Sequence, residues 1–137
     1  ARTGIRHPGP EVGSLLSHYP NVLAWGNGHV HANNITAHHH ALDARRSWWE
    51  INTASHVDFP QMARIIELAD NHDGTVSIFT TLIESNAPYQ ADYDTTDPDG
   101  LASLYREFGA NDIHTRMGRL GTSVDHNTEL LLAHPWA

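Results

Sequence analysis

Residues 63–84 read ARIIELADNHDGTVSIFTTLIE and are the most informative part of the sequence for the fold. Over 75–84, β-branched residues are frequent and the pattern has the period of two that is typical of a half-buried strand. Turn-forming residues occupy 70–74, so residues 63–69 are predicted to pair with 75–84 as a β-hairpin. A helix over 61–69 is the alternative, and the β-rich partner argues against it.

Shorter elements are predicted before the hairpin. Apolar residues at helical spacing indicate a helix over 11–18, which Pro20 ends. The apolar run 22–25 and the segment 47–53, which contains two tryptophans, are predicted strands. Between these strands, residues 27–46 are polar and rich in histidine, and we expect them to form a loop.

The C-terminal third is predicted to be helical. Asp99 is placed to cap a helix over 100–108, with Gly109 at its end. Ser123 is placed to cap a last short helix around 124–133. Strands followed by helices predict an α+β domain, with a sheet-forming part before a polar loop and helical tail. The sheet-forming part is 11–84 and the polar loop and helical tail are 85–137, and both belong to a single domain over 1–137.

Composition excludes several classes of protein. The 137-residue chain has no cysteine, which excludes disulfides and thiolate metal sites, yet it has 12 histidines. All eight basic residues are arginine, and the 16 acidic residues give a formal net charge of −8. Such a chain lacks the basic surface that nonspecific nucleic-acid binding requires. No apolar run approaches the roughly 18 residues of a membrane-spanning helix.

The sharpest candidate for chemistry is Gly28-His29-Val30-His31, directly after the predicted strand 22–25. Two histidines separated by one residue point to the same side of an extended backbone, so both rings can enter one crevice. Imidazole is a good ligand for zinc, manganese and iron. The same spacing is also common in solvated loops, so H-x-H by itself does not define a metal site.

In its context, this string resembles the last metal-binding signature of the calcineurin-like metallophosphoesterases, written G-H-x-H. The ordered segments around it are similar to one branch of that superfamily, the predicted secreted phosphoesterases of actinobacteria, over about residues 11–134. The segments that carry the resemblance are 20–25, 27–31, 49–56, 69–71, 73–75 and 77–81.

The resemblance implies a four-layer αββα fold with two divalent metal ions, which are manganese, iron or zinc. In that family the ions clamp a phosphate and activate a bridging water for in-line attack. Carried over, His29 ligates one ion and His31 ligates the other. The implied reaction is hydrolysis of phosphate mono- or diesters, and the implied location is extracytoplasmic.

The family's other metal signatures are an Asp-x-His, a Gly-Asp, an Asn-His-Glu-like motif and a further histidine, all upstream of G-H-x-H. Residues 1–28 contain none of these signatures. We therefore expect the chain to be the C-terminal part of a larger phosphoesterase and to be inactive alone. Its open sheet edges require the missing N-terminal part of the domain, or self-association, to cover them.

Other polar residues have less specific predicted roles. His56 and Asn33 are candidates to contact the substrate or to support the metal ligands from behind. The run His38-His39-His40 is a candidate adventitious metal site. This run also favours an alternative function, in which the chain is a noncatalytic, histidine-rich module for metal binding or assembly.

Overall fold

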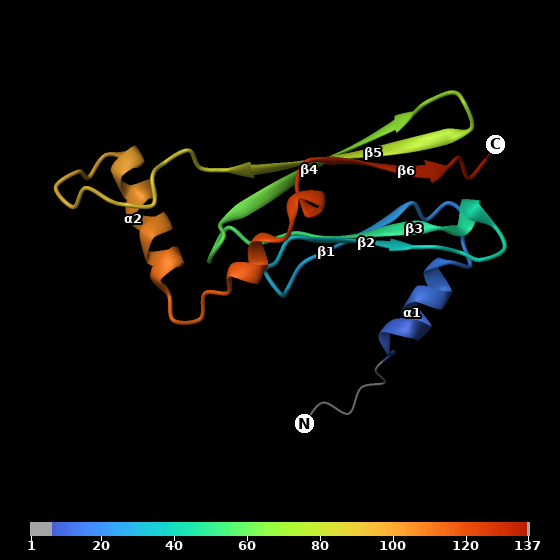
Figure 1. Ribbon diagram of the computed structural model, residues 1–137, viewed down its shortest axis with the longest axis horizontal. Coiled ribbons are helices and arrows are strands. Elements are labelled where there is room, and N and C mark those ends of the chain that lie inside the picture. Colours follow the sequence, from blue (N-terminus) through green and yellow to red (C-terminus); the bar gives the residue numbers. More distant parts are fainter. Residues whose placement is uncertain (1–6, 137) are drawn as a thin grey trace.

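The computed structural model describes residues 7–136 of the chain. Within these residues, two three-stranded sheets pack face to face, with α1 near one end of the molecule and α2 at the other (Figure 1). The predicted α+β class is therefore confirmed. The elements are α1 (Gly9–Leu16), β1 (Ala24–Asn27), β2 (Asn34–His38), β3 (Trp48–Asn52), β4 (Met62–Asp70), β5 (Thr75–Glu84), α2 (Pro98–Asn111) and β6 (Thr128–Ala133), with short 3₁₀ helices at Ala44–Arg46, Met117–Leu120 and Ser123–Asp125.

The first sheet has the strand order β1-β3-β2. β1 runs parallel to β3, whereas β2 runs antiparallel to it. Successive side chains of a strand point to opposite faces, so Trp49 and Ile51 of β3 face the second sheet and Trp48 and Glu50 face away from it. The strands predicted over 22–25 and 47–53 are confirmed in kind, with β1 shifted towards the H-x-H motif.

The second sheet has the order β4-β5-β6 and is antiparallel throughout. β4 and β5 form the hairpin that the sequence predicts, in a register that pairs Asp70 with Val76 and Met62 with Glu84. The turn between them contains Gly74 with a φ of +88°, a left-handed conformation that glycine adopts without steric cost. The helical alternative for 61–69 is therefore wrong.

The core lies between the two sheets. Ile51, Ile78, Leu130 and Leu132 are its buried centre, and Trp49 is among the partly buried residues that pack against them. Complete burial of an aliphatic side chain of this size contributes about 1.5–3 kcal/mol, so this apolar layer is the main force that joins the sheets.

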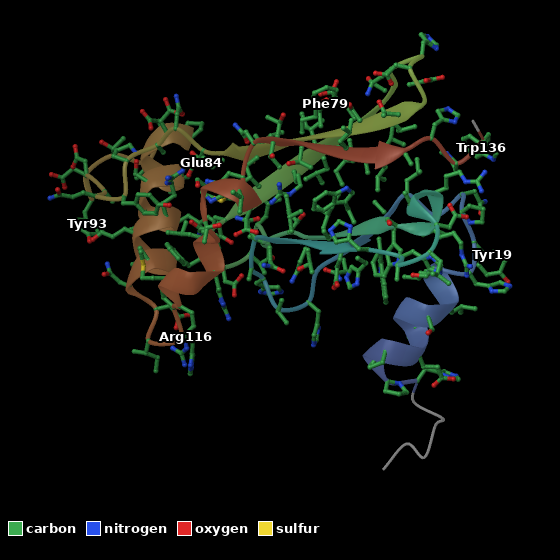
Figure 2. The ribbon with its side chains drawn as sticks, turned by 45° about the vertical axis from the view of Figure 1, so that its right-hand side comes forward. Tyr19, Phe79, Glu84, Tyr93, Arg116 and Trp136 are labelled. Carbon is green, nitrogen blue, oxygen red and sulfur yellow. The ribbon has the colours of Figure 1, made fainter. Side chains whose placement is uncertain are left out.

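The outer face of the second sheet carries a different set of side chains. Phe79 follows Ile78 in β5 and points away from the other sheet, where it is 40% exposed (Figure 2). This alternation is the reason that the apolar segment 75–84 forms a strand with one covered face.

The last strand, β6, contradicts the predicted C-terminal helix over 124–133. Leucine and glutamate favour helices, but the pattern here has a period of two: Leu130 and Leu132 are buried while Glu129 and Leu131 are exposed. Pairing with β5 buries the two inner leucines, which a helix at this place would not achieve. The segment predicted as a helical tail thus contributes a strand to the sheet, and Ser123 begins only a 3₁₀ turn.

β2 is a second correction, because it lies inside the stretch 27–46 that was expected to be a loop. Ile35 and the small Ala37 are the residues of this strand that face the other sheet, so its local apolar signal is weak. Pairing of residues 34–38 with β3 forms the strand.

The ends of α2 also differ from expectation. Asp97 caps this helix, since its Oδ1 accepts a hydrogen bond of 2.8 Å from the backbone nitrogen of Gly100, and Asp99 lies in the first turn. Gly109 does not end the helix, which continues to Asn111. A Cβ at Gly109 would lie 2.7 Å from Nε2 of Gln61, so the absence of a side chain permits close packing there. No helix among residues 7–136 combines the length and apolar character needed to cross a membrane.

Candidate functional site

The H-x-H loop follows directly from the end of β1. His29 and His31 have φ values of 76° and 54°, so both lie in the left-handed region that residues other than glycine seldom adopt. The extended backbone expected for this motif is therefore wrong, and the loop coils at each histidine. Such conformations cost about 1–3 kcal/mol each and are concentrated at functional sites.

His31 lies next to a carboxylate from a distant part of the chain. Its Nδ1 lies 2.7 Å from Oδ1 of Asp58, in the loop after β3. Arg119 donates from Nη1 to the other carboxylate oxygen of Asp58 over 2.8 Å. These three side chains are between 24% and 34% exposed. His29 is exposed to solvent on the same loop.

Asn33 fixes the end of this loop. Its side chain is 2% exposed, and its Oδ1 accepts a hydrogen bond of 3.1 Å from the backbone nitrogen of Ala54. Its Nδ2 donates to the carbonyl of Leu120 over 3.3 Å, and its backbone nitrogen donates to the carbonyl of Arg119 over 2.9 Å. The amide thus holds three segments together, and this geometry supports a structural role for Asn33 rather than contact with a substrate.

Arg64 is a second linking residue, and the sequence gives no sign of it because a charged residue on a strand is usually solvated. Its guanidinium donates to the carbonyls of Asp125 over 2.6 Å and His126 over 2.9 Å, and to Thr80 Oγ1 over 3.0 Å. Burial lowers the pKa of Arg64, and the nearby Asp125 carboxylate opposes this shift. The group remains charged at physiological pH.

His56 lies beside α2. Its exposed side chain borders a cavity of about 270 Å³ that Gln61, Tyr105 and Arg106 also line. The carbonyl of His56 accepts a hydrogen bond of 2.9 Å from the hydroxyl of Tyr105. The predicted helper role of His56 stays a prediction, with this cavity as its surroundings.

The run of three histidines diverges in the structure. His38 stacks on Trp48 with ring centroids 3.8 Å apart, and its Nε2 lies 3.0 Å from a carboxylate oxygen of Glu50. His40 instead accepts a hydrogen bond of 3.1 Å from the backbone nitrogen of Asp43 at its Nδ1. His39 is exposed between them. The three rings therefore have separate surroundings.

The described residues, 7–136, do not form a metal site of three or more histidine, aspartate or glutamate side chains. What the site does offer is two imidazoles on a coiled loop and one oriented carboxylate behind His31. Comparisons with protein-family models, with curated proteins and with solved structures found no match for this chain.

Proposed function

We propose that this chain is the C-terminal part of a metal-dependent phosphoesterase, in which His29 and His31 are ligands to two divalent metal ions. The contact between His31 Nδ1 and the Asp58 carboxylate is the observation that carries the proposal. Metal-binding histidines commonly donate one ring N–H to a carboxylate, which leaves the other nitrogen for the ion. The resemblance of Gly28-His29-Val30-His31 to the G-H-x-H signature gives the same assignment.

The donor set fits such a site in part. Imidazole suits manganese, iron and zinc, and Asp58 is placed to orient one imidazole rather than to bind a metal itself. The described residues bring fewer than three such ligands together, so we assign the remaining ligands to residues outside this chain. When bound, two ions of this kind neutralise a phosphoryl group and activate a water molecule.

The free edge of the first sheet is an argument for an additional strand beside β1. Among the described residues β1 pairs only with β3, so its other edge has unpaired backbone groups. Ile66 and Leu68 lie on the inner face of β4 but are 45% and 64% exposed. Leu68 lines a cavity of about 460 Å³ together with Leu23. A strand added to the edge of β1 would cover these side chains. We propose that the preceding part of the domain supplies it and completes a four-layer αββα sandwich.

The alternative function, a histidine-rich metal-binding or assembly module, has less support. It depends on His38, His39 and His40 acting together, and two of these rings are engaged with different neighbours.

The proposed activity is tested in the longest natural chain that contains residues 1–137. Hydrolysis of bis(p-nitrophenyl) phosphate is measured with added Mn²⁺ for the wild type and for His31→Ala. Loss of a metal ligand removes several kcal/mol of transition-state stabilisation, so kcat/KM should fall by about 10³-fold. His72→Ala is the matched control, because His72 lies in the hairpin turn with 87% of its side chain exposed. Unchanged turnover in His31→Ala would contradict the proposal.

A further inference from the structure

Asp58 and His31 come together because of the topology of the first sheet. β1 and β3 are parallel neighbours, so their C-terminal ends lie at the same end of the sheet. The loop after β1 carries His31 and the loop after β3 carries Asp58, and the two side chains meet with 2.7 Å between Nδ1 and Oδ1.

Oδ1 of Asp58 needs a hydrogen-bond donor. This atom is buried, and the described residues supply it with no well-aligned donor. A buried carboxylate oxygen without a donor is costly, and Nδ1 of His31 is the nitrogen placed beside it. Since a carboxylate only accepts, the proton of the neutral ring belongs on Nδ1, and Nε2 keeps the lone pair that binds a metal ion.

Arg119 fixes the carboxylate from the other side. Its Nη1 donates to Oδ2 of Asp58 over 2.8 Å, which leaves Oδ1 directed to His31. The carbonyl of Arg119 accepts a hydrogen bond of 2.9 Å from the backbone nitrogen of Asn33, two residues after His31. The short 3₁₀ helix Met117–Leu120 therefore holds both the H-x-H loop and its carboxylate partner.

We propose that Asp58 is a positioning residue for His31. Its carboxylate accepts a hydrogen bond from Nδ1–H, which sets the tautomer and orientation of the ring and directs Nε2 to the metal, while Arg119 holds Asp58 in place. The metal part of this proposal rests on the proposed function. The tautomer part does not, because it follows from the contacts among His31, Asp58 and Arg119 alone.

The tautomer is measured by ¹⁵N–¹H NMR correlation of the histidine ring nitrogens. The sample is the longest natural chain that contains residues 1–137, without metal and at alkaline pH, where histidine rings are neutral. The His31 signals are assigned by their loss in His31→Gln. The expected form in the wild type carries the proton on Nδ1.

Two substitutions of Asp58 test whether the His31 ring needs a hydrogen-bond acceptor at this position or only a side chain that fills the space. In Asp58→Asn the new amide can donate to Nδ1, so the proton of the His31 ring should move to Nε2. Asp58→Glu keeps an acceptor and should restore the Nδ1-protonated form. A wild-type ring protonated on Nε2, or one tautomer shared by the wild type and Asp58→Asn, would overturn the positioning role.

Titration with Mn²⁺ gives the second readout. Removing a carboxylate behind a metal-bound histidine typically weakens metal affinity by about 10–100-fold, so Asp58→Asn should show this loss and Asp58→Glu should recover most of it. Asp43→Asn is the matched control, because Asp43 pairs with Arg45 at the surface. Equal losses in both Asp58 variants would overturn the positioning role. An inverted tautomer with unchanged Mn²⁺ affinity would instead overturn the proposed function and keep Asp58 as the group that sets the tautomer.

Discussion

Replacing Asp125 with alanine should break the connection between β2 and the segment that follows α2. The carboxylate is 5% exposed and accepts three hydrogen bonds. Oδ1 accepts from the backbone nitrogen of Ile35 over 2.8 Å, whereas Oδ2 accepts from the backbone nitrogen and the hydroxyl of Thr122, each over 2.7 Å.

The expected loss follows from the exposure of the three donors. The Ile35 N–H is partly buried, and losing its hydrogen bond to a charged acceptor costs about 1.5–3 kcal/mol. The two donors of Thr122 belong to an exposed residue and can bond to water, so each contributes about 0.5–1 kcal/mol. The free energy of unfolding should therefore fall by roughly 2.5–5 kcal/mol, a large share of the about 5–15 kcal/mol that stabilises a typical domain.

Urea unfolding of the wild type, Asp125→Ala and Asp73→Ala measures this loss. Asp73 is a matched control, because its Oδ1 accepts from the backbone nitrogen of Thr75 over 3.0 Å and from its hydroxyl over 2.6 Å, but in an exposed turn. Its loss should stay below about 1 kcal/mol. Equal losses in the two variants, or a loss below 1 kcal/mol for Asp125→Ala, would refute the reasoning from burial.

Three further predictions concern the same framework. Gly121→Ala should be strongly destabilising in a thermal melt, because the φ of Gly121 is +77° and a Cβ there would lie 2.6 Å from the carbonyl of Asn33; a melting temperature equal to that of the wild type would contradict this. Burial would raise the pKa of Asp125, but hydrogen bonds from Thr122 and Ile35 bring it below its ordinary value. The stabilisation by the Asp125 carboxylate should thus be complete above about pH 5 and be lost as the pH falls through the lowered pKa. In Asp125→Asn, the free energy of unfolding should therefore depend less on pH in this acid range. Leu130→Ala should cost about 2–5 kcal/mol in urea unfolding and Leu131→Ala much less, whereas similar costs would contradict the strand β6.

The sequence predicted those parts of the fold whose signal is local. The hairpin of 63–84 has its turn residues and its alternation within one short stretch, and β3 and α1 are similarly self-contained. β6 was mistaken for a helix because leucine and glutamate favour helices, and only its pairing with β5, far along the chain, decides otherwise. β2 has little local signal, because its inward residues are one large apolar side chain, Ile35, and the small Ala37.

The residues of the candidate site also differ in whether a local sequence pattern predicts them. The motif located His29 and His31, since it is contiguous and follows a strand. The partner of His31 was not predicted, because Asp58 and Arg119 reach it through tertiary structure rather than through spacing. Asn33 was predicted to contact the substrate or to support the ligands, and its buried amide favours support. The coiled backbone at both histidines has no signal in the sequence, where residues other than glycine are expected to avoid that conformation.

Metal stoichiometry tests the central claim most directly. The longest natural chain that contains residues 1–137, together with its His29→Ala and His31→Ala variants, is loaded with Mn²⁺, dialysed and measured by inductively coupled plasma mass spectrometry. The account predicts two ions per wild-type chain and no more than one in either variant, with the His72→Ala control equal to the wild type. Two ions retained in both His29→Ala and His31→Ala, or no ion bound by the wild type, would contradict it.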